Sequence, residues 1–445
     1  MSHRSGRTNA SRNTLSGGVA STGASVSSQI TSASVLASKV EFKHWVALVG
    51  LDREQVIELV IPLNQAFQHL RDVKDQSNRF PNWLTVADSP QFAQIPTGLR
   101  TASNRLFSDL SEIKISNPEQ FHDGDDLTLS ELLAILQACN HTRRLSNRLG
   151  KPTEMDGRFV LDSLLNHLCE CDEDALLEYS TEQELKLPRA PFGKFDATKT
   201  KPDGLLYLEI PDYKPYDLTS HVRTALSAFV PDIPTHLRVV HCVAEFKREA
   251  SGAKQAIMGI VSGVWQKRVL KVPGQFTFGV FHHEKVFLYL VAGVWQADEK
   301  IHLYEIGQYT TLDPVRTLQF YLALQAIQRL AVSYRDQLRA SERSLAAHAS
   351  ANPPAAEWSV IRMESVTEHP NEFDGQTPHA GGANAQTETN EQCENRDKVL
   401  SYLSRTSDQY GFLPVDLPPT PPIDPPASPI DSTKPGSIDH PNRHR

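Results

Sequence analysis

Residues 239–247 have the sequence Val239-Val-His-Cys-Val-Ala-Glu-Phe-Lys247, an apolar run that ends in two charged residues. A run of β-branched and apolar residues of this length predicts a buried β-strand. Successive side chains of a strand point to opposite faces, so Glu245 and Lys247 project to one side while Ala244 and Phe246 project to the other. The strand is therefore expected to present a carboxylate and an ammonium together at its end.

A second segment supplies another carboxylate ahead of a strand. Lys201-Pro-Asp-Gly204 precedes an apolar run of strand length. If the two strands are neighbours, Asp203 and Glu245 form a two-carboxylate pocket with Lys247 next to it. Mg²⁺ is held by one or two carboxylates together with water and phosphate oxygens. Alternatively, Asp203 only shapes the turn, and Glu245 and Lys247 form an ion pair on a solvated strand end.

The segments around this pair predict an α/β fold. Apolar runs of strand length follow one another, and helical patterns separate and close them. We predict strands at Leu205–Ile210, Arg238–Phe246, Phe276–Phe281, Val286–Val294 and Ile301–Ile306, and helices at Ala253–Val269 and Asp313–Arg343. This order predicts a mixed sheet of about five strands with flanking helices, spanning residues 151–345.

Helical spacing dominates the chain ahead of this core. Apolar residues recur at steps of three and four between Val56 and Leu70, which predicts an amphipathic helix. Thr128-Leu-Ser-Glu131 has the pattern of a capping box at the start of another helix. A third helix is predicted from about Asp156 to Cys171. Residues 38–150 are therefore predicted to be a helical region that precedes the α/β core.

Both ends of the chain have compositions that disfavour a packed core. Residues 1–37 are rich in Ser, and residues 346–445 are rich in Pro, with few large apolar side chains. Such segments cannot bury enough apolar surface to offset chain entropy. We predict two disordered tails, of which the Pro-rich C-terminal one is a candidate for binding protein partners.

The composition excludes several classes of protein. The chain has 445 residues and a formal net charge of -8, so any surface for nucleic acid has to be local. No stretch approaches the roughly 20 apolar residues of a membrane span, and the first residues lack the apolar segment of a secretory signal. We expect an intracellular protein without a membrane partner, with the nucleus slightly favoured over the cytoplasm. No P-loop, dinucleotide fingerprint or kinase motif set is present.

Asp203 and the later Glu245-Phe-Lys247 resemble the signature of the PD-(D/E)xK nuclease superfamily. The resemblance covers roughly residues 150–345 and extends to proteins of mushroom-forming fungi that share a Glu-Phe-Lys strand and a Gln-containing helix. It implies a restriction-endonuclease-like core in which Asp203 and Glu245 bind Mg²⁺ and Lys247 is catalytic. It also implies site roles for Gln255, on the helix after the Glu-x-Lys strand, and for Glu154, ahead of the helix that precedes the core.

Basic residues near this site suggest a local positive edge. If the helix after the Glu-x-Lys strand flanks the pocket, they can contact the phosphate backbone of DNA or RNA. Alternatively, they are ordinary solvated helix charges. These residues are Arg248, Lys254, Lys267 and Arg268.

Two functions follow from these observations. The resemblance implies a Mg²⁺-dependent nuclease that hydrolyses nucleic-acid phosphodiesters. The alternative is a catalytically inactive scaffold with a nuclease fold, or a nuclear regulatory protein, acting through protein partners.

Overall fold

A computed structural model of the chain defines the fold. It describes residues 29–30, 32–52, 61–124, 127–148, 150, 152–171, 176–191, 195–247, 252–283, 287–297, 299–351 and 358. Most of the two predicted tails lies outside these ranges. Helix α1 begins at Ala33 and helix α11 ends at Ala351, so both enter stretches that we expected to be disordered. Among the described helices, none is both long and apolar enough to span a membrane.

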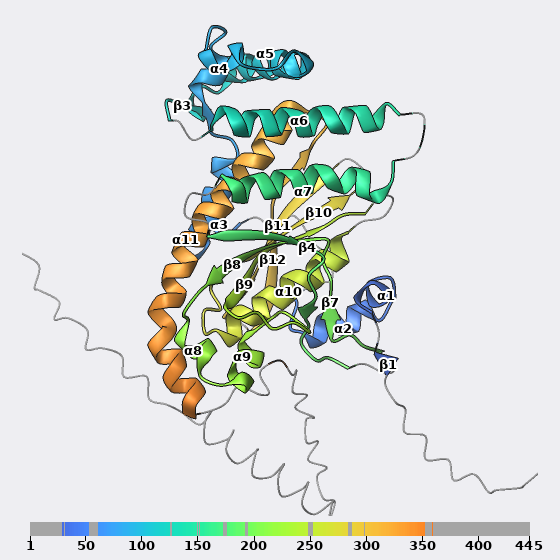
Figure 1. Ribbon diagram of the computed structural model, residues 1–445, viewed down its shortest axis with the longest axis vertical. Coiled ribbons are helices and arrows are strands. Elements are labelled where there is room, and N and C mark those ends of the chain that lie inside the picture. The colour runs from blue at the N-terminus through green and yellow to red at the C-terminus, as the bar shows by residue number, and fades with distance from the viewer. Residues whose placement is uncertain are drawn as a thin grey trace, which may run out of the picture. The chain divides into compact units, whose positions relative to one another are not determined.

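A six-stranded mixed sheet forms the centre of the described residues (Figure 1). The strand order is β12-β11-β10-β9-β8-β4, in which β9 and β10 are parallel and the other neighbours are antiparallel. The α/β class and the mixed sheet are confirmed. The strands are β4 (Leu177–Thr181), β8 (Gly204–Ile210), β9 (Leu237–Glu245), β10 (Thr277–His283), β11 (Phe287–Trp295) and β12 (Ile301–Thr310).

Strand β4 is the one strand of this sheet that we did not predict. Its sequence, Leu177-Glu-Tyr-Ser-Thr181, is short and mostly polar. It pairs with β8 at the edge of the sheet, where one face can remain solvated. Apolar periodicity therefore could not reveal it.

Helix α10 (Ala253–Val269) connects the two parallel strands and has the bounds predicted from the sequence. Parallel neighbours require such a crossover, because a hairpin joins only antiparallel strands. Two glycines let the helix lie directly on the sheet. A Cβ atom at Gly259 would lie 3.1 Å from Val243, and one at Gly263 would lie 2.6 Å from Thr277.

The other helices pack on the same core. Helix α11 contacts α3, α5, α6 and α7, and the buried apolar side chains form one continuous cluster. Capping boxes at Thr128 and Thr153 begin α6 and α7. The helices are α1 (Ala33–Ala37), α2 (Phe42–Leu48), α3 (Gln68–Gln76), α4 (Pro90–Ala93), α5 (Arg100–Ser116), α6 (Leu129–Ser146), α7 (Glu154–Glu170), α8 (Lys214–Asp217), α9 (Ser220–Leu226), α10 and α11 (Pro314–Ala351).

Short elements complete the described fold. The helix expected between Val56 and Leu70 is present as a 3₁₀ turn that leads into α3, whereas residues 53–60 lie outside the described ranges. The 3₁₀ turns are η1 (Gln65–Phe67), η2 (Asn82–Thr85), η3 (Thr97–Leu99) and η4 (Pro118–Gln120). The two-residue strands pair as β1 (Gln29–Ile30) with β6 (Phe195–Asp196), β2 (Phe80–Pro81) with β3 (Phe121–His122), and β5 (Leu185–Lys186) with β7 (Lys199–Thr200).

A one-residue bulge in β9 decides which of its side chains face α10. Opposite residues 206–207 of β8, the pairing passes from Cys242 to Val240 and leaves His241 as the extra residue. Val240 and Val243 consequently both contact glycines of α10. Simple alternation would put them on opposite faces. The orientation of the charged end of β9 therefore depends on the bulge as well as on the period of the strand.

Candidate active site

The register of β8 and β9 brings an aspartate and a glutamate to the same end of the sheet. Gly204 pairs with Ala244 in the antiparallel ladder, so the preceding Asp203 lies across from Glu245. The Oδ2 of Asp203 accepts a hydrogen bond of 2.7 Å from the backbone amide of Phe246. This bond ties the turn before β8 to the end of β9.

Lys247 lies among three carboxylates. Its Nζ is 2.8 Å from Glu245 Oε1, 3.3 Å from Glu154 Oε1 and 4.0 Å from Asp203 Oδ2. Partial burial disfavours the ammonium, but the charge of Glu245 and then of the other carboxylates outweighs this effect and raises the pKa of Lys247. The fold thus brings four of the predicted site residues together, three carboxylates around the Lys247 ammonium. They come from α7, from the end of β9 and from the turn before β8.

Glu245 is the buried member of this cluster. It is 1% exposed, and its Oε2 has no hydrogen-bond partner among the described residues. Desolvation, followed by the charge of Asp203, raises the pKa of Glu245 to about 7 against the opposing effect of Lys247. Desolvation also raises the pKa of Asp203. A cation bound between the two carboxylates would satisfy the unpartnered oxygen and favour both ionised forms.

Arg158 of α7 holds Asp203 from another side. Its side chain is 7% exposed, its Nη1 lies 3.5 Å from Asp203 Oδ1, and its Nη2 donates to the Asp203 carbonyl. The same guanidinium lies 2.9 Å from Asp162 and 3.4 Å from Glu182. Arg158 was not predicted from the sequence. The available signal was its position four residues after Glu154, where a basic residue enters the apolar face of a helix.

The two residues predicted at the start of α10 contact the first helices of the chain. Gln255 Nε2 donates a hydrogen bond of 3.1 Å to Ser34 Oγ of α1. The ammonium of Lys254 lies 5.1 Å from the ring centroid of Phe42 in α2. Gln255 is therefore on the helix where we expected it, with its side-chain amide directed to α1.

Two other basic residues predicted at the site, Lys267 and Arg268, lie away from the carboxylates. Lys267 is 0% exposed, and its Nζ donates to the Phe276 carbonyl and to Thr277 Oγ1, so it has no surface with which to meet a phosphate backbone. Arg268 lies over the ring of Trp295, at the opposite end of α10 from Lys254. With a rise of about 1.5 Å per residue, roughly 20 Å separate these two positions along the helix. Arg248 lies outside the described residues.

The two carboxylates fit a magnesium site that has few protein ligands. Within the described ranges, no three His, Cys, Asp or Glu side chains form a metal-ligating group. Mg²⁺ usually keeps several waters and takes one or two carboxylates plus the phosphates of its substrate. Asp203 and the unpartnered Oε2 of Glu245 supply ligands of this kind and number.

Comparison with protein-family models and with curated proteins finds no match for this chain.

Proposed function

We propose that this chain is a PD-(D/E)xK-like nuclease that hydrolyses nucleic-acid phosphodiesters with the help of Mg²⁺. The observation that carries this proposal is the meeting of Asp203, Glu245 and Glu154 around the ammonium of Lys247. Three separate segments supply these groups, and the pair of ligands suits a hard divalent cation. The resemblance of the residue pattern to this nuclease superfamily supports the same reaction.

Each residue has a role in the proposed reaction. Asp203 and Glu245 would hold the ion, which would supply Lewis-acid stabilisation of the phosphate and activation of the attacking water. Lys247 donates hydrogen bonds to the attacking water or to a phosphate oxygen, and stabilises the negative charge that develops there. Glu154 holds the Lys247 ammonium from α7, and Arg158 positions Asp203.

The proposal is tested by metal-dependent cleavage with the full-length protein. Labelled single-stranded and duplex DNA and RNA are incubated with Mg²⁺ or Mn²⁺. We expect Asp203→Asn and Lys247→Met to lower the cleavage rate by about 100-fold or more, which is the usual cost of losing a group that stabilises transition-state charge. Glu112→Gln removes an exposed carboxylate from α5 and serves as the control.

Metal binding gives an independent measurement. Calorimetry with Mn²⁺ should detect binding to the wild type and none to Asp203→Asn. If Asp203→Asn and Lys247→Met cleave as fast as the wild type, these residues do not carry the activity. If the wild type neither binds metal nor cleaves any substrate, the nuclease proposal is wrong and the scaffold alternative replaces it.

Two earlier expectations accompany this proposal. A nucleic-acid substrate agrees with an intracellular location, nuclear or cytoplasmic. Binding of protein partners through the Pro-rich C-terminal tail stays a prediction, because residues 359–445 lie outside the described ranges.

A further inference from the structure

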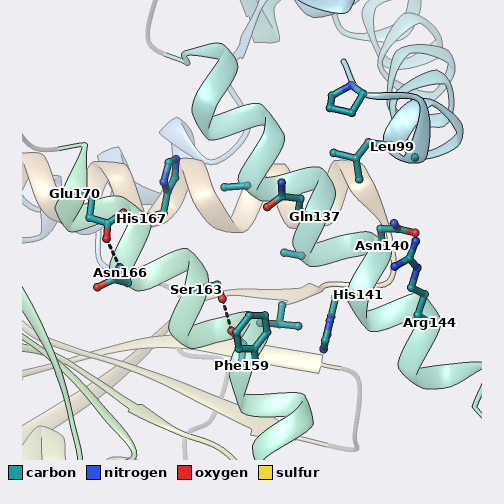
Figure 2. A pocket seen from close by; sticks show the side chains of 15 residues that line it. Leu99, Gln137, Asn140, His141, Arg144, Phe159, Ser163, Asn166, His167 and Glu170 are labelled. Atoms are coloured by element: carbon teal, nitrogen blue, oxygen red, sulfur yellow. Dashed lines mark hydrogen bonds between the residues drawn. The ribbon is translucent and has the colours of Figure 1, made fainter. Parts of the chain in front are cut away.

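A groove of about 580 Å³ lies between α6, α7 and the segment that leads into α5 (Figure 2). Its lining is mixed, with apolar side chains next to carboxamides, imidazoles, one arginine and one carboxylate, Glu170, which accepts a hydrogen bond of 2.6 Å from Asn166 Nδ2. Figure 2 shows Gln137, Asn140, His141 and Arg144 on α6, with the imidazole of His141 beside the Phe159 ring of α7. The groove thus combines polar groups of several kinds with an open aromatic ring.

Phe159 is the aromatic group of this groove, and it is 57% exposed. Its ring lies 5.3 Å from the imidazole of His141, measured between centroids and tilted by 45°. His141 Nε2 donates to the Asp156 carbonyl at 3.3 Å, which fixes the imidazole against α7. Phe159 therefore offers an accessible ring face beside a second ring that is held in place.

The polar groups around this ring have the chemistry that nucleobases and phosphates require. Gln137, Asn140 and Asn166 carry amides, which both donate and accept hydrogen bonds as base edges do. Arg144 is exposed and lies near the C-terminal end of α6, in the same lining. A guanidinium there can contact a phosphate or stack on a base.

The groove is connected to the carboxylate site through α7. A second cavity, of about 590 Å³, lies between α7 and β4 and shares Phe159 and Asn166 with the first. Its lining includes Asp162, which is paired with Arg158 at 2.9 Å, and Arg158 in turn contacts Asp203. The two cavities therefore adjoin on the exposed side of the helix that also supplies Glu154 and Arg158.

We propose that the groove between α6 and α7 binds unpaired nucleobases of a single-stranded nucleic acid, next to the phosphodiester at the carboxylate site. This inference rests on the proposed nuclease function and names its substrate class. Aromatic stacking requires the face of a base, which a duplex covers and a single strand exposes. Phe159 is the stacking platform, the three amides contact base edges, and Arg144 contacts the backbone.

The inference is tested by binding without cleavage. Fluorescence anisotropy of the full-length protein in EDTA compares a labelled 20-nucleotide single strand with a blunt duplex of the same sequence. We expect tighter binding of the single strand, and a loss of about tenfold in its affinity for Phe159→Ala. Arg144→Ala should weaken binding and make it less dependent on salt. Ile115→Ala, which removes an exposed apolar side chain from α5, is the matched control and should bind as the wild type.

The outcomes separate this inference from the proposed function. If the wild type prefers the duplex, or if Phe159→Ala binds the single strand as the wild type does, the groove is not a base-binding site. If the wild type nevertheless cleaves with Mg²⁺, only the base-binding inference is wrong and the nuclease proposal stands. If Phe159→Ala weakens single-strand binding but the wild type does not cleave with Mg²⁺, the nuclease proposal falls and the groove remains a single-strand binding site. Retention of a peptide from this chain's own tail, in place of an oligonucleotide, would also overturn the inference.

Discussion

Phe246 packs so closely against Gly157 that a Cβ atom at position 157 would lie 2.3 Å from the ring Cζ. A face of the same ring stacks on His282, with ring centroids 4.5 Å apart. Gly157 lies one turn beyond Glu154 on α7, and Phe246 immediately precedes Lys247. This contact therefore sets the distance between the helix and the strand end that carry the proposed site.

Gly157→Ala is expected to destabilise the fold. In an exposed helix, replacing Gly by Ala stabilises by about 0.5–1 kcal/mol. Here the clash with Phe246 dominates, and overpacking of this kind costs about 1–3 kcal/mol. Urea unfolding measures the difference. Gly98→Ala is the control, because a Cβ atom there meets nothing within 4 Å, and it should be neutral or slightly stabilising. An unchanged midpoint for Gly157→Ala would contradict the contact.

Arg158→Met is expected to lower the free energy of unfolding by about 2–3 kcal/mol, because Asp203 and Asp162 lose their buried partner. Arg158→Lys should recover part of this loss, because an ammonium keeps the positive charge but cannot place several N–H donors as the planar guanidinium does. Urea unfolding of both variants checks this expectation. Arg105→Met breaks an exposed pair with Asp313 and should cost less than about 1 kcal/mol. Equal losses at the two arginines would show that the Arg158 network does not stabilise the fold.

Lys267→Met is expected to make the stability of the fold less dependent on pH. Burial lowers the pKa of Lys267 well below its ordinary value of 10.5. The folded state therefore disfavours the protonated ammonium of Lys267. As the pH falls below 10.5, protonation of this side chain in the unfolded state lowers the free energy of unfolding. The free energy of unfolding should therefore differ less between pH 7 and pH 9.5 in Lys267→Met than in the wild type. Lys199 is exposed, so Lys199→Met should show the same difference in unfolding free energy between the two pH values as the wild type.

His241 is expected to make the fold sensitive to acid. Burial, and then the charge of Lys267, lowers its pKa from 6.5 to about 3. Its contribution to stability is complete above pH 6.5 and is lost progressively toward pH 3, by at most about 1.4 kcal/mol per pH unit. Guanidinium denaturation measures the free energy of unfolding between pH 7 and pH 4. This free energy should decline less toward pH 4 in His241→Phe than in the wild type. His221 is exposed, so His221→Phe should leave the decline unchanged. Identical pH profiles for all three proteins would exclude His241 as the cause.

Much of the local structure could be predicted from the chain. The strand ending at Glu245 and the bounds Ala253–Val269 of α10 follow from apolar runs and periodicity. The capping box at Thr128 follows from spacing alone. By contrast, β4 escaped prediction because a short edge strand of polar residues carries little apolar signal. These signals are local, so they identify elements whose conformation depends on neighbours in the sequence.

The candidate site could be predicted only in part. Asp203, Glu245, Lys247 and Glu154 do come together, and the sequence indicated their side-chain chemistry. The buried position of Lys267 could not be foreseen, because its contact with the Phe276 carbonyl depends on how α10 lies against the start of β10.

Patterns along the chain predict five strands of the sheet, the helix that crosses between its parallel strands, the charged ends of two strands and the cap at Thr128. The tertiary structure decided that Arg158 holds Asp203, that His241 forms a bulge and that α6 and α7 leave a groove beside Phe159. Periodicity and capping act over a few neighbouring residues. Strand register, helix approach and burial, in contrast, are set by packing between segments that are distant along the chain.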